Sequence, residues 1–142
     1  MWAIMASPLL ISGNVRNMSD YVLSTYKNKG AIAINQDTLG KQGIRVMGSN
    51  LTINGANATN VWMKPLAGDE HAIAFLNVGS SAADIHCDAY CFAMGGLVST
   101  EQKWYAVEVY SGKQAQIESP YELTATGVAA EGGSALFRIK RC

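Results

Sequence analysis

The spacing of apolar positions changes near residue 43 and divides the chain into two parts. Residues 1–6 are apolar and predict the tail of a helix, which Ser7-Pro8 ends because the residue before a proline avoids the helical region. Residues 9–12 form a continuous apolar run, which is typical of a strand buried on both faces. After residue 43, short apolar stretches alternate with turn sequences. The two parts therefore predict different architectures.

A helix is predicted after the apolar strand. Ser19 is a good N-cap, and Asp20 suits the positive end of a helix dipole. Lys29 and Gly30 predict the end of this helix, as a late cation and a glycine cap. Residues 31–34 alternate as a strand does, although so short a stretch does not decide between strand and helix. A buried strand, a turn and a helix in this order are typical of an α/β barrel or a doubly wound sheet.

The strand predicted at 9–12 lacks a hydrogen-bonding partner in this chain. A parallel strand is joined to its neighbour through a long crossover connection, so a single strand–helix unit cannot complete its own ladder. We therefore expect the neighbours of this strand to be encoded upstream. Residues 1–43 are interpreted as the last strand and helix of a larger α/β domain.

Nine short strands are predicted after residue 43, with turn sequences such as Ser111-Gly112-Lys113 between them. Short strands at this spacing predict an antiparallel β-sandwich, so the fold class is expected to be mainly β. Residues 44–142 are assigned to this sandwich domain. The predicted strands are 44–47, 61–66, 71–78, 83–87, 96–98, 104–110, 114–118, 122–126 and 135–140. The predicted core consists of Trp62, Ile73, Phe75, Trp104, Val107, Val109, Leu136 and Ile139.

Composition narrows the classes of function. Hydrophobic residues make up 49% of the 142 residues and charged residues 15%, which is typical of a globular chain. Eleven basic and eleven acidic residues give no net charge, so nucleic-acid binding is not expected. The longest basic run, Arg138, Lys140 and Arg141, is predicted to lie on a solvated edge strand. No apolar run approaches the roughly 20 residues of a membrane span, and residues 1–11 lack the basic start of a signal peptide.

The cysteines and histidines are the candidates for metal ligands, and the cysteines are also candidates for a disulfide. Cys87 and Cys91 could form half of a metal site, but no second Cys or His pair lies at zinc spacing. His71 and His86 are isolated and are interpreted as surface or half-buried strand residues. A disulfide between Cys87 and Cys91 is the preferred interpretation, and it implies an oxidising compartment. The third cysteine, Cys142, is the last residue.

Three N-glycosylation sequons agree with a secreted protein. They begin at Asn17, Asn50 and Asn57, and none has proline at its middle position. All three asparagines are predicted glycosylation sites.

Reactive side chains do not form a recognisable active site in this sequence. Its carboxylates are not placed as a general acid beside a nucleophile, and it contains no Walker loop or G-x-G-x-x-G motif. Asp37, in the polar cluster Asn35-Gln36-Asp37, is interpreted as a structural cap or turn residue and only secondarily as a site residue. Neither a catalytic residue, a metal ligand nor a cofactor-binding residue is therefore expected.

Three stretches carry a family resemblance: WAIMASPLLIS at 2–12 followed by Val15-Arg16, IAINQD at 32–37 followed by LGKQG at 39–43, and VWMKPL at 61–66 followed by AIAFLN at 72–77. In this order and spacing they resemble glycoside hydrolase family 27, the melibiases. The CDAYCF stretch at 87–92 looks like the small disulfide loop of the animal lysosomal α-galactosidases.

This resemblance implies a (β/α)8 barrel followed by a C-terminal antiparallel β-sandwich. It makes residues 9–12 the eighth barrel strand and residues 19–28 the start of the eighth helix, with a helix at 31–35. The family consists of retaining glycosidases, in which two aspartates lie roughly 5–5.5 Å apart. Their K-x-D and D-P-D-M motifs are absent from this chain, so the resemblance assigns no catalytic residue to it.

Two positions depart from the family pattern. Asn14 stands where the family usually has Asp, so a charge pair with Arg16 becomes a neutral hydrogen bond. Thr38 stands where the family usually has Pro, after Asp37. These differences concern the activity of the parent enzyme and not its fold.

The function implied by the resemblance is that of the C-terminal part of an α-galactosidase, which cleaves terminal α-linked galactose from glycans or glycolipids. The alternatives are an α-N-acetylgalactosaminidase and a non-catalytic β-sandwich that binds glycans or supports assembly. Exposed aromatics such as Tyr90, Tyr105 or Tyr121 on one face would favour the non-catalytic alternative. The resemblance also implies a homodimer and a lysosomal or extracellular location. The isolated chain is expected to be inactive and poorly soluble.

Overall fold

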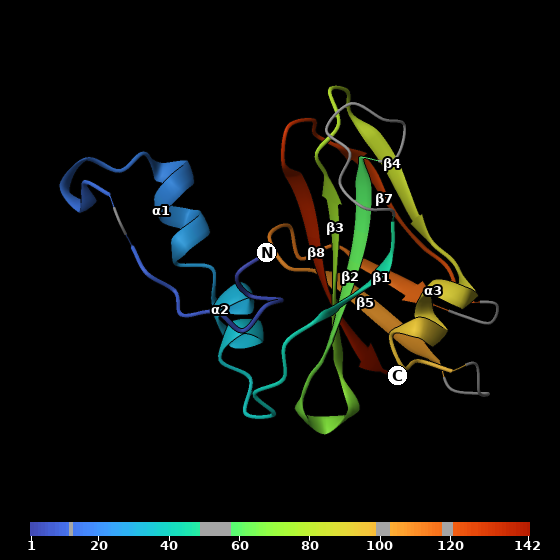
Figure 1. The fold of residues 1–142 in the computed structure, drawn as a ribbon. Helices are drawn as coiled ribbons and strands as arrows, with labels where there is room; N and C mark the ends of the chain where they lie inside the picture. The colour runs from blue at the N-terminus through green and yellow to red at the C-terminus, as the bar shows by residue number, and fades with distance from the viewer. Residues whose placement is uncertain (12, 49–57, 99–102, 118–120) are drawn as a thin grey trace.

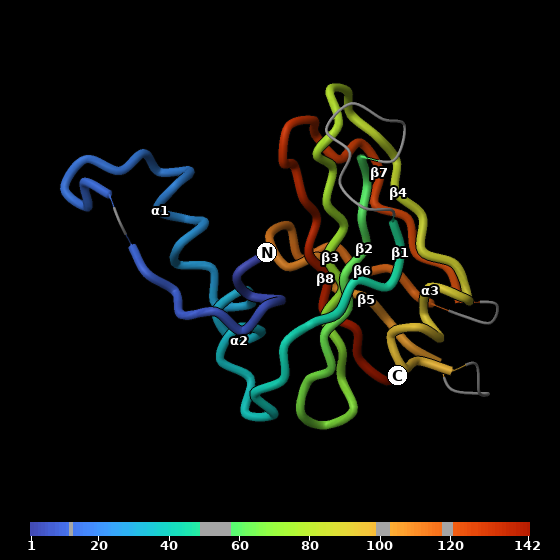
Figure 2. The backbone as a smooth tube through the Cα atoms, viewed as in Figure 1, coloured from blue at the N-terminus to red at the C-terminus, as the bar shows by residue number. Residues whose placement is uncertain are grey.

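The computed structural model describes residues 1–11, 13–48, 58–98, 103–117 and 121–142. Strands form two antiparallel sheets that face each other, and the N-terminal segment lies against the outer face of the larger sheet (Figure 1). The first residues and helix α2 lie next to this sheet, whereas the stretch around α1 extends away from it (Figure 2). The expectation of a mainly β fold with a sandwich is confirmed.

The helical elements of the N-terminal segment are short. Ser19 is the N-cap of α1 and accepts a hydrogen bond from the amide of Val22, as the sequence predicts. The predicted end of this helix is wrong, because Asn28 caps a second helix whose first residues are Lys29 and Gly30. Residues 31–34 are therefore helical, as the family resemblance implies. The helices are η1 (Val15–Asn17), α1 (Asp20–Tyr26), α2 (Lys29–Asn35), η2 (Ala67–Asp69) and α3 (Ala89–Met94).

Eight strands follow within the described ranges, and they are close to the predicted ones with one exception. Residues 96–98 are not a strand, because they directly follow α3, whose C-terminal turn Gly95 and Gly96 close. The strands are β1 (Ile44–Met47), β2 (Thr59–Pro65), β3 (His71–Asn77), β4 (Ala83–Cys87), β5 (Trp104–Glu108), β6 (Gln114–Ile117), β7 (Leu123–Val128) and β8 (Gly133–Arg141).

The larger sheet has the order β1-β2-β3-β8-β5-β6, and the smaller one pairs β4 with β7. Strand β8 is therefore an interior strand, paired with β3 on one side and β5 on the other. The prediction of a solvated edge strand for its basic residues is wrong. Arg138 and Lys140 bind Glu70, and Arg141 lies 3.4 Å from the Asp69 carboxylate and over the Trp104 ring.

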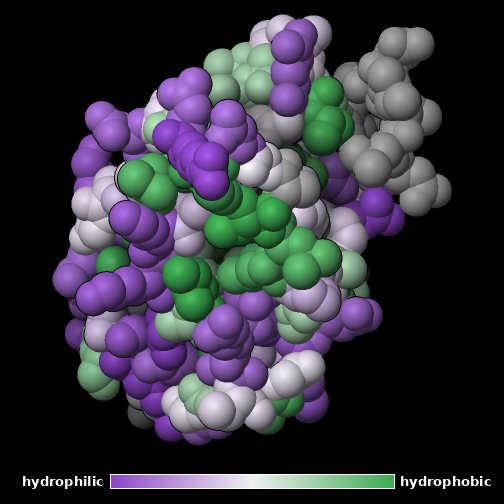
Figure 3. Space-filling model, turned by 90° about the vertical axis from the view of Figure 1, so that its left-hand side faces the viewer, coloured by the Kyte–Doolittle hydropathy of each residue, from purple (hydrophilic) through white to green (hydrophobic). Residues whose placement is uncertain are grey.

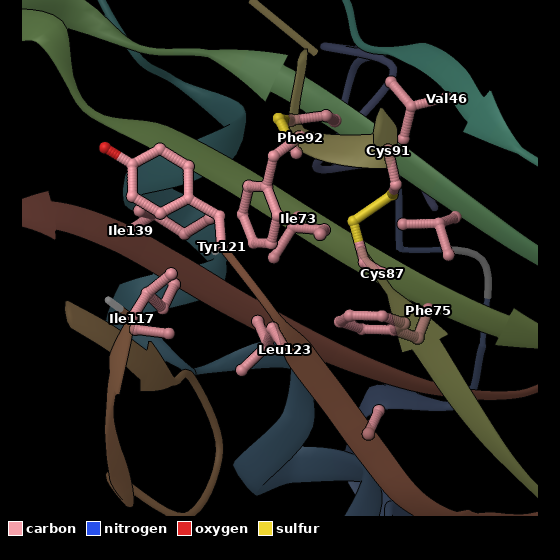
Figure 4. Packing of buried hydrophobic residues seen from close by; sticks show 14 of the residues in the cluster. Val46, Ile73, Phe75, Cys87, Cys91, Phe92, Ile117, Tyr121, Leu123 and Ile139 are labelled. Atoms are coloured by element: carbon pink, nitrogen blue, oxygen red, sulfur yellow. A yellow bond between two sulfur atoms is a disulfide. The ribbon is translucent and has the colours of Figure 1, made fainter. Parts of the chain in front are cut away.

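Alternation along β2 and β3 creates two cores. Odd-numbered apolar residues such as Met63 and Phe75 point between the two sheets, where they form the main core with residues of β4, β7 and α3 (Figure 4). The small residues Ala72 and Ala74 point the other way and form a second core with Ile4 and Leu66. Small side chains on this outer face let the N-terminal segment approach the sheet closely. The second core joins residues 1–43 to the sandwich.

Most of the predicted core residues are buried, including Ile73, Phe75, Trp104, Leu136 and Ile139. The exceptions are Trp62, Val107 and Val109, which are only half-buried. Trp62 and Val109 belong to the outer-face cluster, where the thin cover of the N-terminal segment leaves them partly accessible.

Of the strand predicted at 9–12, the described residues 9–11 do not form a strand. Leu9, Leu10 and Ile11 have no regular structure and are exposed by 41%, 70% and 57%, while residue 12 lies outside the described part. A run suited to burial on both faces needs a neighbour on each side, and these residues have none here. Residues 1–6 form turns instead of a helix tail, with one helix-like bond from the Met5 amide to the Met1 carbonyl.

Among the described residues, no helix is long and apolar enough to cross a membrane.

Candidate functional site

The contact between residues 1–43 and the larger sheet has Lys64 at its centre. Strand β2 places this side chain on the outer face of the sheet, where it is fully buried. Its Nζ donates to the carbonyl of Ile34 at 2.5 Å, to that of Ala3 at 3.1 Å and to that of Asn35 at 3.5 Å. One amino group therefore links the sheet to two separate segments, one at Ala3 and one at the end of α2.

The end of α2 suits a cationic donor. The last carbonyls of a helix have no partner within the helix and carry a partial negative charge. Lys64 satisfies two of them, those of Ile34 and Asn35. Burial lowers the pKa of the Lys64 ammonium, and the charge of Asp37 opposes this shift.

Asp37 connects the turn at residues 37–40 to the sandwich. Its Oδ1 accepts hydrogen bonds from the Leu39 amide at 3.0 Å and from the Ala67 amide at 2.9 Å. The Gly40 amide also donates to the Asp37 carbonyl, which closes the turn that contains Thr38. The expected structural role of Asp37 agrees with this geometry.

Two asparagines complete the polar contacts of this interface. Asn35 Nδ2 donates to the carbonyls of Trp2 at 3.1 Å and Ser7 at 2.7 Å, so it ties the end of α2 to the N-terminal turns. Asn28 caps α2 with its oxygen and donates from Nδ2 to the Val109 carbonyl at 3.1 Å, beyond the end of β5.

An apolar groove of about 640 Å³ lies beside these polar contacts. It runs between the N-terminal segment and the outer face of the sheet. Figure 3 shows a continuous apolar area on the side of the molecule where this segment lies, with hydrophilic residues around it. The side chains that line it include Trp2, Leu10, Ile11, Tyr26, Ala74 and Leu136.

The predicted disulfide between Cys87 and Cys91 is present. Both sulfurs are buried in the main core, next to Phe75 and Phe92 (Figure 4). Asp88 caps helix α3, which contains Cys91, by accepting from the Cys91 amide at 2.9 Å. Cys142 is exposed and free.

Both histidines lie on strands, as predicted. His71 is half-buried on β3 with its ring 6.4 Å from that of Trp104, and burial lowers its pKa while Asp69 opposes the shift. His86 is exposed on β4, with Nδ1 2.8 Å from the Thr124 hydroxyl.

The structure describes one of the three predicted glycosylation sites. Asn17 is exposed at the end of η1, two residues before the N-cap Ser19. Asn50 and Asn57 lie outside the described residues. Asn14, the departure from the family pattern, accepts with its Oδ1 from the backbone amide of Arg16 at 3.2 Å.

The three tyrosines considered for a glycan-binding face do not form one exposed group. Tyr90 is 72% exposed on α3, Tyr105 is half-buried on β5, and Tyr121 is buried. The Tyr121 hydroxyl accepts from Trp104 Nε1 at 3.1 Å, which is a core interaction. Within the described parts of the chain, no group of three or more His, Cys, Asp or Glu side chains could hold a metal ion.

Sequence reasoning missed Lys64, which donates to three carbonyls across this interface. The sequence does contain a signal for a buried, hydrogen-bonded lysine, because Lys64 is the one charged residue in the apolar run VWMKPL at 61–66. A strand in the middle of a sheet buries both faces, so a lysine within such a run needs buried acceptors.

The fold and this interface define a β-sandwich that carries a short helical segment on its outer face. Residues 1–37 match the family model for α-galactosidase A, and residues 56–139 match the model for the α-galactosidase C-terminal β-sandwich domain. The second match covers more than half of the chain. The chain therefore belongs to the α-galactosidase family, glycoside hydrolase family 27.

Relatives from a plant and from an animal are similar to this chain. The chain is 42% identical over 101 residues to α-galactosidase 3 from Arabidopsis thaliana, covering 70% of this chain and 21% of the relative. It is 35% identical over 106 residues to human α-galactosidase A, covering 65% of this chain and 23% of that protein. The chain thus spans about a fifth of the length of these relatives.

Solved structures share the fold. The α-galactosidase from Saccharomyces cerevisiae with raffinose aligns with a TM-score of 0.83 at 21% identity, covering 99% of this chain and 42% of that one. The α-galactosidase I from Mortierella vinacea aligns with a TM-score of 0.82 at 22% identity, covering 97% of this chain and 33% of that one.

Proposed function

We propose that this chain is the C-terminal part of a retaining glycoside hydrolase that removes terminal α-linked galactose from glycans or glycolipids. In this proposal the two catalytic aspartates belong to a barrel encoded upstream. The observation that carries it is the order of the two family matches, the α-galactosidase A model at 1–37 and then the C-terminal β-sandwich model at 56–139, in a chain whose two parts are joined through Lys64. Curated relatives named α-galactosidase favour galactose over N-acetylgalactosamine as the sugar.

Residues 1–43 are proposed to be the last strand and helix of that barrel, and residues 44–142 the sandwich domain. Exposure of Leu10 by 70% and Ile11 by 57% supports this division, because both belong to a run suited to a strand buried on both faces. In the complete enzyme the neighbouring barrel strand and helices would cover these residues and fill the apolar groove. Burial of such surface is the main force that would hold the barrel there.

The compartment proposed is the secretory pathway, with the lysosome or the extracellular space as destination. A disulfide between Cys87 and Cys91 supports an oxidising environment. The exposure of Asn17 is compatible with glycosylation, and Asn50 and Asn57 are proposed as further sites on their sequons alone. A homodimer of the complete enzyme is proposed from the family resemblance.

Extension of the transcript upstream of Met1 tests the proposal. The extended reading frame should encode the K-x-D and D-P-D-M motifs, and its purified product should hydrolyse a nitrophenyl α-galactoside faster than the matching α-N-acetylgalactosaminide. The isolated 142-residue chain, purified in parallel, should release no nitrophenol above a blank. An extended frame without these motifs, or turnover by the isolated chain, would contradict the proposal.

A further inference from the structure

Residues 2–7 are held from two sides. On one side Lys64 of the sheet binds the Ala3 carbonyl, and the Gly43 amide donates to the Ile4 carbonyl at 2.7 Å. On the other side Asn35 of α2 binds the carbonyls of Trp2 and Ser7. Residues 8–11 follow directly after these held residues, so the contacts of residues 2–7 determine where residues 8–11 begin relative to the sandwich.

Lys64 is a costly residue at this position. A buried ammonium loses its hydration, and replacing a buried charge by an apolar side chain is often neutral or stabilising. A methionine is close to the four-carbon stem in length and is fully apolar, so it suits a buried position on this face. Packing alone therefore does not explain an ammonium here, whereas three carbonyl acceptors from two separate segments do.

We infer that Lys64 is the positioning residue that holds the end of α2 and residues 2–7 on the sheet, and thereby sets the position of residues 8–11 relative to the sandwich. The inference rests on the proposed function only for its consequence, because those residues lead into the proposed eighth barrel strand. Removing the amino group takes a donor away from the buried carbonyl of Ile34 and from the part-buried carbonyls of Asn35 and Ala3. The penalty falls on the N-terminal segment and not on the sandwich, whose strands pair with one another.

The test is amide hydrogen exchange of the full 142-residue chain as wild type and as Lys64→Met, Lys64→Arg and Lys113→Met. Informative amides are those of Ser7, which donates to Trp2, and Gly43, which donates to Ile4. In Lys64→Met their exchange should be roughly ten-fold faster, because the carbonyls that bind Lys64 lose their donor. Amides of β3 and β8 should keep their wild-type exchange rates. Lys113 is an exposed lysine, so Lys113→Met should match the wild type everywhere.

Lys64→Arg provides the second variant, since its guanidinium offers several donors for the same carbonyls. It should restore slow exchange at Ser7 and Gly43. Unchanged exchange at these amides in Lys64→Met overturns the inference, and so does faster exchange in β3 and β8 or a chain that no longer folds, because the role would then be general stability. Exchange at Ser7 and Gly43 that stays fast in Lys64→Arg also counts against the inference. The experiment measures no hydrolysis, so its failure would leave the proposed function standing, and an inactive extended enzyme would leave the role of Lys64 standing.

Discussion

The two parts of this chain show what an apolar stretch needs in order to become a strand. Ile73 of β3 and Leu10 both lie in strongly apolar runs, yet Ile73 is fully buried whereas Leu10 is 70% exposed. Strand β3 pairs with β2 and β8, and both partners are encoded in the same 142 residues. Residues 9–11 have no such partner in the described structure. An apolar run thus shows that a segment is suited to burial, but the ladder forms only where neighbours are available.

The difference extends to how each part is stabilised. The sandwich is held by a large core between two sheets, whose members are far apart in sequence. The N-terminal part has only two fully buried hydrophobic side chains among its described residues, Ile4 and Ile34, and both lie against the sheet. Polar contacts through Lys64, Asp37 and Asn35 therefore carry much of its attachment. Substitutions in the two parts should have unequal effects.

The largest effect is expected in the main core. Phe75 is fully buried on β3, with its ring 5.7 Å from that of Phe137. Phe75→Ala should lower the free energy of unfolding by about 3–5 kcal/mol, because it removes buried surface and leaves a cavity. Urea denaturation followed by tryptophan fluorescence measures this change. Tyr90→Ala, at an exposed position, should stay within about 0.5 kcal/mol of the wild type, and a similar loss for both would contradict the assigned core.

A smaller effect is expected from the disulfide. The double variant Cys87→Ala and Cys91→Ala should lose about 2 kcal/mol of unfolding free energy, because the bridge closes only a short loop and restricts the unfolded chain little. Denaturation under non-reducing conditions measures the loss. Cys142→Ala is the matched control and should change nothing, since this cysteine is exposed and free. If the double variant matches this control, the bridge does not stabilise the sandwich.

The smallest change in stability is expected at the exposed apolar run. Leu10→Asp should leave the free energy of unfolding within about 0.5 kcal/mol of the wild type, because Leu10 is mostly exposed. It should also raise the monodisperse fraction in size-exclusion chromatography, since exposed apolar patches favour aggregation. A loss above about 1 kcal/mol would show that Leu10 is covered in the isolated chain in solution. Leu10→Ala, which keeps an apolar side chain, should improve solubility less.

Much of the sandwich could be predicted because its signals are local. Alternation within single strands located β1 and β4 at their observed bounds, and Ser19 marked the start of α1. The errors occurred where distant parts of the chain decide. Gly30 is typical of a helix end, yet Asn28 caps a new helix there. The Asn28 side chain also donates to the Val109 carbonyl, 81 residues away.

The site was less predictable than the fold. Lys64 contacts carbonyls 30 and 61 residues away, and no spacing rule links a strand lysine to a helix end and an N-terminal turn. The basic residues of β8 were assigned to an edge strand because sequence alone does not give strand order, and strand order decides whether a strand lies at an edge or inside a sheet. Their ion pairs with Asp69 and Glu70 likewise follow from the position of β8 beside β3.

The sequence by itself determined the mainly β class, most of the strands, the Cys87–Cys91 bridge and, through the order of its motifs, the family. These features depend on local periodicity, on short spacings or on residue identity. Only the tertiary structure decided the order of the strands, the placement of residues 1–43 on the outer face of the sheet and the contacts of Lys64. Each of these depends on which surfaces meet in space, and the free energy of such contacts is shared between segments that lie far apart along the chain.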